Sequence, residues 1–152
     1  MRETDRLHIR ALVPGDYENW QQAYSMLKPA KNKWDESPWK LSELTKLKFC
    51  LLLATHKKLR ASDDSYWYGI FRNDDGVLLG MISLMDISRN NFQNAYIGYR
   101  IFNNYWGQGY ATEACRATLD VGFKELKLHR IEAGIEPANK VSIKVAKAIG
   151  LR

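Results

Sequence analysis

Two glycines one residue apart, Gly107 and Gly109, stand between an apolar stretch that ends at Phe102 and a helical pattern that follows. Glycine adopts positive φ angles and admits close backbone approach, so successive N–H groups can converge on an anion. The helix behind them adds a partial positive charge at its N-terminus, which favours phosphate there. The spacing is not that of a Walker loop, and the dinucleotide pattern GxGxxG fails because Thr112 stands where its third glycine should be. On the residues alone, the segment is a phosphate-binding turn or only a tight turn.

A second group, Asn139 and Ser142, stands between an apolar segment and the last helical pattern. Asparagine is a preferred helix cap, and a serine three residues later falls in the first turn of the helix. This pairing needs no function beyond local helix chemistry. Lys140, Lys144 and Lys147 follow on the same helix, where they form a solvated face or reach toward the phosphates of a ligand.

Two tryptophans, Trp34 and Trp39, occur in the segment of residues 28–39, which also contains two prolines and charges of both signs. Because aromatic side chains are large and apolar, exposing two of them in one loop is unfavourable. The segment is therefore either a plain surface connection or a wall of a substrate cleft, since binding residues concentrate on loops.

These residues must be positioned by a mixture of strands and helices. Polar–apolar alternation and short apolar runs predict strands over 6–12, 66–72, 77–87, 95–102 and 130–136. Helical spacing predicts helices from 14 or 16 to 24, from 43 to 60 with Ser42 as cap, from 109 to 126 and from 139 to 149. The turn at residues 73–76 predicts a hairpin, and short connections make the three central strands antiparallel. The sequence therefore predicts one mixed α/β (α+β) domain over residues 1–152.

The chain has 152 residues, with 23 Lys and Arg against 17 Asp and Glu, which gives a net charge of +6. This charge favours an anionic ligand or partner. The basic residues are scattered and no nucleic-acid-binding pattern occurs, so we expect no nucleic acid partner. Cys50 and Cys115 lack metal-ligand spacing, so we expect no metal. No apolar run has the length of a membrane span and no signal segment is evident, so we expect a cytoplasmic protein without a membrane partner.

Four segments, taken in order, resemble the GCN5-related N-acetyltransferase (GNAT) superfamily, most closely the RimJ/RimL-like branch that acetylates N-terminal amines of ribosomal proteins. They are RLHIRALVPGD (6–16), GMISLMDI (80–87), IGYRIFNNYWGQGYATEA (97–114) and HRIEAGIEPANKVSIKVAKAIGLR (129–152). In this family the turn has the sequence motif [QR]-x-x-G-x-[GA]. The stretch from Trp106 to Ala111 matches this motif, except that Trp106 replaces Gln or Arg. The resemblance implies the GNAT fold, with a cleft between strand 95–102 and strand 130–136.

The same resemblance implies that acetyl-CoA is the cosubstrate, and that the amides of the turn hold its diphosphate. Asn139 would bond to the pantetheine arm, and Ser142 would donate a hydrogen bond to the departing thiolate. The candidates for contact with the acceptor are Tyr99 and the two tryptophans of the loop of residues 28–39, Trp34 and Trp39. The implied acetyl-CoA-binding residues are Ile101, Phe102, Trp106, Gly107, Gln108, Gly109, Tyr110, Ala111, Thr112, Asn139 and Ser142.

The family reaction is direct attack of an amine on the thioester, without an acyl-enzyme. Glu136, at the end of predicted strand 130–136, is the first candidate for the base, with Glu132 and a water chain as alternatives. A peptide α-amine has a pKa near 8 and a lysine near 10.4, so neutralising lysine at pH 7 costs about 3 kcal/mol more. The expected acceptor is therefore the N-terminal α-amine of a protein or peptide, ribosomal proteins included.

Two other functions remain open: acetylation of a small amine such as a polyamine or antibiotic, and CoA binding without catalysis. The family continues after the last helix with a further strand and its hairpin partner, whereas this sequence ends at Arg152. The domain is thus expected to be short at its C-terminus. An unpaired sheet edge favours association, so a homodimer is compatible with the sequence.

Overall fold

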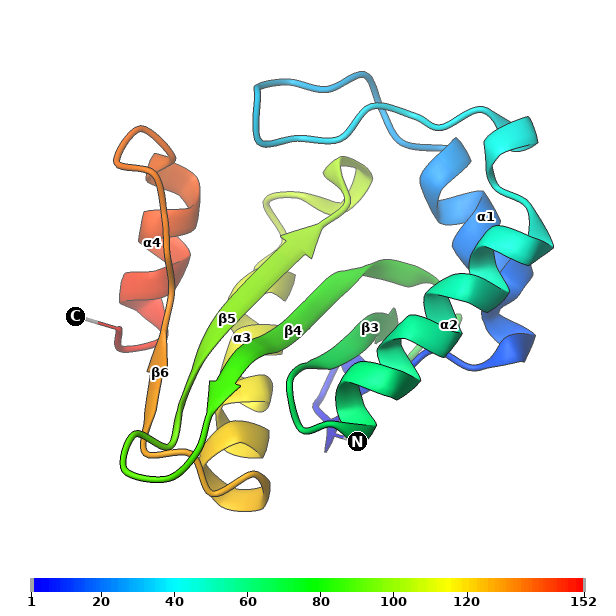
Figure 1. Cartoon of the computed structure of the whole chain (residues 1–152). Coiled ribbons are helices and arrows are strands. Elements are labelled where there is room, and N and C mark those ends of the chain that lie inside the picture. The colour runs from blue at the N-terminus through cyan, green and yellow to red at the C-terminus, as the bar shows by residue number, and fades with distance from the viewer. Residues whose placement is uncertain (1, 152) are drawn as a thin grey trace.

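The computed structural model describes residues 2–151 and contains one six-stranded sheet with helices on both faces (Figure 1). The strands lie in sequence order; β1 to β5 are antiparallel neighbours, and β6 runs parallel to β5. The strands are β1 (Arg2–Glu3), β2 (Leu7–Arg10), β3 (Tyr66–Arg72), β4 (Leu78–Ser88), β5 (Asn94–Ile101) and β6 (Arg130–Glu132). The α-helices are α1 (Tyr17–Ser25), α2 (Lys46–Ala61), α3 (Tyr110–Asp120) and α4 (Lys140–Ala148). Among the described residues, no helix combines the length and apolarity that crossing a bilayer requires.

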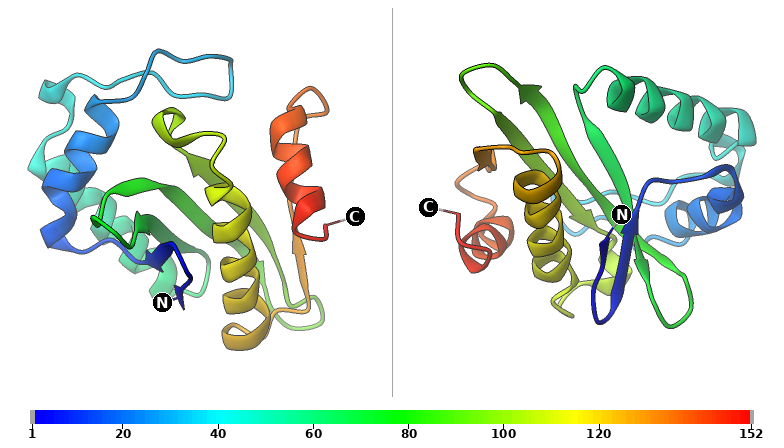
Figure 2. Two further views of the ribbon diagram at one scale, coloured as in Figure 1. Left: turned by 180° about the vertical axis from the view of Figure 1, so that it is seen from behind. Right: turned by 90° about the horizontal axis from the view of Figure 1, so that it is seen from below.

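The two faces of the sheet are covered by different helices, which divides the core into two halves (Figure 2). Trp20 of α1 and Phe49 of α2 pack in one half, and Cys115 of α3 packs in the other. Successive residues of a strand point to opposite faces. Accordingly, Leu78 belongs to the α1/α2 half and its neighbour Leu79 to the α3/α4 half, and both are fully buried.

The predicted antiparallel order of the three central strands is confirmed, and a tight turn joins β3 to β4. Several boundaries differ from the prediction, and two of the differences have a clear structural cause. The cap of α2 is Thr45, whose hydroxyl accepts from the Lys48 amide at 3.2 Å, because Ser42 belongs to a preceding 3-10 turn (Leu41–Glu43). Strand β6 ends at Glu132 rather than at Glu136, because the chain then leaves β5 and loses its pairing partner. The short β1, paired with β2, was not predicted.

Candidate functional site

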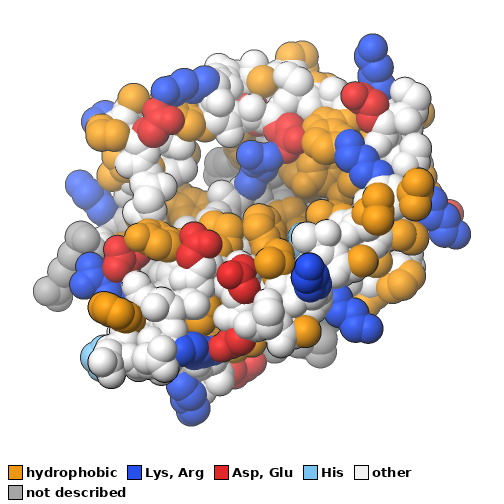
Figure 3. All heavy atoms as spheres, in the orientation of Figure 1, with side chains coloured by type: hydrophobic (Ala, Val, Ile, Leu, Met, Phe, Trp, Pro, Cys, Tyr) orange, Lys and Arg blue, Asp and Glu red, His pale blue; other side chains and the backbone are white. Residues whose placement is uncertain are grey.

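The parallel strands β5 and β6 separate after a short paired stretch, and this opens the sheet. Residues 94–96 of β5 pair with residues 130–132 of β6, and no pairing continues beyond them in the described chain. The gap forms a cleft of about 750 Å³. Figure 3 shows it as a hollow between α4 and the loop of residues 28–40. Of the predicted site residues, the cleft brings together Trp34, Tyr99, Ile101, Trp106, Gly107, Gln108, Gly109, Tyr110, Ala111, Thr112, Asn139 and Ser142.

Strand β5 turns backbone groups into this cleft. The Phe102 amide donates to the Leu79 carbonyl at 2.8 Å, on the β4 side. Because alternate residues of an antiparallel strand direct their amide and carbonyl to opposite sides, Tyr99 and Ile101 direct theirs toward the gap. An extended ligand with amide groups can add to such an edge as a further strand would. Phe102 itself lies outside the cleft, with its side chain buried in the α1/α2 half of the core.

Strands β4 and β5 lie unusually close together at Gly80, opposite the part of β5 that no longer pairs with β6. A Cβ placed on Gly80 would stand 2.1 Å from the Arg100 carbonyl oxygen and 2.9 Å from the Ile101 Cα. Any side chain at this position would push the two strands apart. Gly80 therefore allows β5 to pack tightly on β4 where its other edge is open.

The two glycines of the turn adopt the left-handed conformation that the sequence suggested. Their φ angles are +81° at Gly107 and +80° at Gly109, and Gly109 caps α3. The first four amides of a helix have no carbonyl partner within it. Here the first amide bonded inside the helix is that of Glu113, which donates to the Gly109 carbonyl at 3.2 Å. The preceding amides and the helix dipole together give this end of the cleft a positive potential.

Trp106 fastens this turn to the end of β5. Its indole Nε1 donates to the Ile101 carbonyl at 2.6 Å, and the Lys31 ammonium lies 5.4 Å from its ring centroid. The indole thus occupies one backbone acceptor of the open edge. The Ile101 amide and both backbone groups of Tyr99 are the remaining groups there.

The start of α4 forms the opposite wall. Asn139 caps the helix as predicted, since its side-chain oxygen accepts from the Ser142 amide at 3.2 Å. The Tyr99 hydroxyl donates to the Ser142 carbonyl at 2.9 Å and joins β5 to α4 across the cleft. Burial raises the pKa of Tyr99 to about 12, so this phenol is neutral at pH 7.

The loop of residues 28–40 covers one side of the cleft. Asn103 holds it by accepting from the Lys28 amide at 2.9 Å and donating to the Asp35 carboxylate at 3.0 Å. Trp34 lines the cleft. Trp39 does not, because its ring packs on the α1/α2 half of the core.

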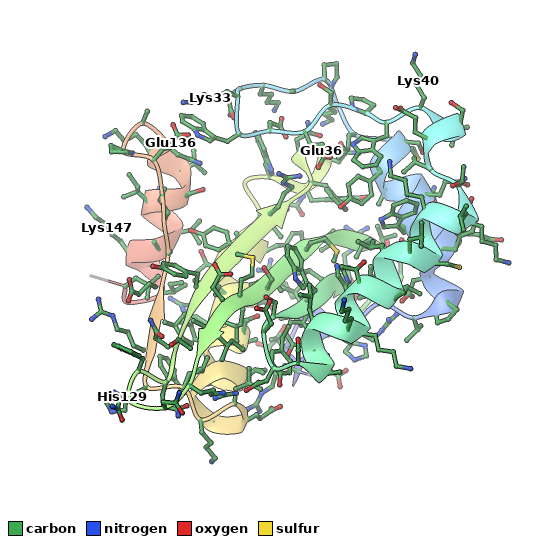
Figure 4. All side chains as sticks on the ribbon, in the orientation of Figure 1. Lys33, Glu36, Lys40, His129, Glu136 and Lys147 are labelled. Atoms are coloured by element: carbon green, nitrogen blue, oxygen red, sulfur yellow. The ribbon has the colours of Figure 1, made fainter. Side chains whose placement is uncertain are left out.

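The two carboxylates considered as bases are both paired. Glu136 is exposed, and its carboxylate lies 2.5 Å from the Lys33 ammonium, which joins the loop of residues 28–40 to the segment before α4 (Figure 4). The hydrogen bond from Lys33 lowers the pKa of Glu136, which makes it a weaker proton acceptor. Glu132 lies 2.6 Å from the Arg130 guanidinium. Neither carboxylate lines the cleft.

Sequence reasoning missed Arg6 as a contributor to the site. Its guanidinium contacts the glycine turn from outside the cleft, although 102 residues separate Arg6 from Gln108. Local pattern carries no signal for such a contact. Within residues 2–151, no group of three or more His, Cys, Asp or Glu side chains is arranged to hold a metal ion.

Comparison with known proteins identifies the family of the chain. The chain matches the family model described as an acetyltransferase (GNAT) domain over residues 6–152. The probable N-acetyltransferase YjcK of Bacillus subtilis (strain 168) is 46% identical over 88 residues, which are 58% of this chain and 49% of that protein. The ribosomal protein uS5-alanine N-acetyltransferase of Escherichia coli (strain K12) is 28% identical over 143 residues, covering 91% of this chain and 71% of that protein.

A solved structure described as Mycobacterium smegmatis RimJ in complex with CoA-disulfide aligns with a TM-score of 0.77. The two chains are 20% identical, and the alignment covers 95% of this chain and 69% of the RimJ chain, so the likeness shows a shared fold. The matched region spans about half the length of the first curated relatives.

Proposed function

Because the chain belongs to the GNAT acetyltransferase family, we propose that it transfers the acetyl group of acetyl-CoA to a primary amine, namely the N-terminal α-amine of a protein or peptide. One observation carries the proposal: an open backbone edge on β5 lies next to a left-handed glycine turn that lines the same cleft. The edge suits an extended arm that contains amides, and the turn suits a diphosphate. CoA contains both groups joined in one molecule.

In this proposal the donor is held along the whole length of the cleft. The amides from Gly107 to Thr112 bind the diphosphate, and the backbone of Ile101 pairs with the pantetheine arm, which Asn139 also contacts. Lys140 and Lys144 line the same cleft and supply positive charge for the phosphates.

The chemistry requires a neutral amine beside the thioester carbonyl. The amine nitrogen bonds to the acetyl carbon, the carbon–sulfur bond breaks, and the thiolate takes up a proton. A backbone amide of the open β5 edge polarises the carbonyl. Ser142, in the first turn of α4, donates a hydrogen bond to the departing sulfur, and the helix N-terminus stabilises its negative charge.

We propose that Glu136 accepts the proton of the amine through water, since its carboxylate lies outside the cleft lining. The low pKa that Lys33 imposes on Glu136 makes it a weak base. A weak base suffices for an α-amine, whose pKa near 8 leaves a usable neutral fraction at pH 7.

The charge of the cleft favours a peptide over a polyamine as acceptor. Among the described residues, its lining contains Arg100, Lys140 and Lys144 but no carboxylate. Arg100 is paired with the Glu36 carboxylate. Lys140 and Lys144 are assigned to the phosphates, so the lining that the structure describes offers no free carboxylate that would attract a polycation. A peptide needs none, because it brings one amine and neutral amides. The E. coli relative named for uS5-alanine acetylation makes an N-terminal alanine of a ribosomal protein the first acceptor to test.

Release of CoA from acetyl-CoA tests the proposal. A peptide with a free N-terminal alanine should support release, and the same peptide with a blocked N-terminus should not. Spermidine at equal concentration should be the poorer acceptor. A preference for spermidine would replace the acceptor class, and CoA binding without release to any amine would leave a binding module instead of an enzyme.

A further inference from the structure

The side chain of Arg6, between β1 and β2, supports the glycine turn from outside. Its Nη1 donates to the Gln108 carbonyl at 2.9 Å, and its guanidinium carbon lies 4.7 Å from the centroid of the Tyr110 ring. Arg6 lines a groove on the outer side of the turn and is absent from the lining of the cleft. It therefore contacts the backbone of the turn without reaching the space that a ligand would occupy.

The position of the Gln108 carbonyl determines where the next amide points. A trans peptide is planar, so its C=O and N–H point in opposite directions. Arg6 holds the Gln108 carbonyl on the outer side. The Gly109 N–H of the same peptide is thereby directed inward, to the cleft that Gln108 and Gly109 both line. Gly109 is left-handed in this orientation of the peptide, and α3 begins at the next residue.

Glu113 fixes the guanidinium in place. Its carboxylate accepts from Arg6 Nε at 2.8 Å, lies 2.6 Å from Nη2, and also accepts from the Thr4 hydroxyl at 2.7 Å. Burial alone would raise the pKa of Glu113, but the hydrogen bonds from Thr4 and Arg6 outweigh it and lower that pKa. Glu113 is thus an anion at neutral pH, and it lies in the first turn of α3, the helix that Gly109 caps.

We propose that Arg6 is a positioning residue that aims the Gly109 amide at the diphosphate of CoA and so sets the affinity for that group. The inference rests on the proposed function, because it takes CoA as the ligand. Without the guanidinium, the 108–109 peptide is free to rotate about the ψ bond of Gln108 and the φ bond of Gly109, and one hydrogen bond to a charged phosphate is lost part of the time. Loss of one such bond corresponds to a roughly tenfold or greater weakening.

Calorimetric titration with CoA and with 3′-dephospho-CoA tests this role in Arg6→Gln, Arg6→Lys and Arg89→Gln. Arg89 is a matched control, because its guanidinium also binds one carboxylate, that of Asp63, and one backbone carbonyl, that of Leu126, but away from the cleft. We expect Arg6→Gln to weaken both ligands by the same factor of about ten. Arg6→Lys should recover only part of this loss, because an ammonium cannot hold the carbonyl and the carboxylate in one rigid fork. Arg89→Gln should bind both ligands as the wild type does.

Three results would overturn the inference. The first is wild-type CoA affinity in a folded Arg6→Gln protein. The second is full recovery in Arg6→Lys, which would assign the loss to charge alone. The third is a loss confined to CoA, which would place Arg6 at the 3′-phosphate. A wild-type protein that binds neither ligand would instead refute the proposed function.

Discussion

Replacing Gly109 with alanine separates the conformational role of the turn from its binding role. The φ angle of +80° is one that an L-residue adopts at a cost of about 1–2 kcal/mol. The new Cβ would meet only Arg6 Nη2, at 3.5 Å, which is an ordinary contact. The variant should therefore fold, with a midpoint of thermal unfolding lower by roughly 3–6 °C for a chain of this length.

The same substitution should weaken CoA binding by about tenfold or more, because relaxing φ rotates the peptide whose amide faces the cleft. Gly76→Ala is the matched control: its φ is +70°, no atom lies within 4 Å of the added Cβ, and it is in the β3–β4 turn. Thermal unfolding and calorimetry on both variants measure the two effects. If Gly109→Ala and Gly76→Ala lost the same stability and Gly109→Ala kept the CoA affinity of the wild type, the assignment of the turn to the diphosphate would be refuted.

Three further substitutions test the site and its surroundings. Ser142→Ala should lower kcat by roughly a hundredfold without changing stability, since the α4 cap uses its amide and not its hydroxyl. Unchanged turnover would remove its proposed role. Because Lys33 lowers the pKa of Glu136, the carboxylate is ionised at neutral pH, so Glu136→Gln should lower kcat at neutral pH, and this loss should shrink as the pH falls through that pKa. Lys33→Gln, which breaks the same ion pair but keeps the carboxylate, should retain kcat at neutral pH; equal effects would remove Glu136 as proton acceptor. Burial and Arg60 lower the pKa of His56 from 6.5 to about 4, so the stability it contributes is complete above pH 6.5 and is lost as the pH falls toward 4. In His56→Phe the free energy of unfolding should fall by about 1–2 kcal/mol less than in the wild type between pH 6.5 and 4, after allowance for solvent screening. A pH dependence unchanged from the wild type would contradict the role of His56.

Features that depend on residues close together in the sequence were predictable. The alternation and turn residues between 66 and 102 placed three antiparallel strands, and the two glycines placed the start of a helix. The Asn139 cap followed from its spacing to Ser142. In each case the physical cause, a backbone preference or a local hydrogen bond, acts within a few residues.

Features that depend on distant parts of the chain were not predictable. Gly80 matters because Arg100 passes within contact distance on the next strand, and Arg6 matters because it reaches Gln108. Trp39 was assigned to a substrate wall, but it lies outside the cleft lining and packs, partly buried, against the α1/α2 half of the core. Strand β6 was drawn too long because the composition of residues 133–136 does not reveal where its partner strand diverges.

Thermal unfolding in the presence of acetyl-CoA tests most directly whether the cleft between β5 and β6 is a CoA site. A ligand that binds only the folded chain stabilises it by about 2.7 kcal/mol at a hundred times its Kd, which is roughly 8 °C for this chain length. We predict a rise of this size that grows with the logarithm of the acetyl-CoA concentration and is strongly reduced in Gly109→Ala. An unfolding midpoint that stays constant up to millimolar acetyl-CoA would contradict the account.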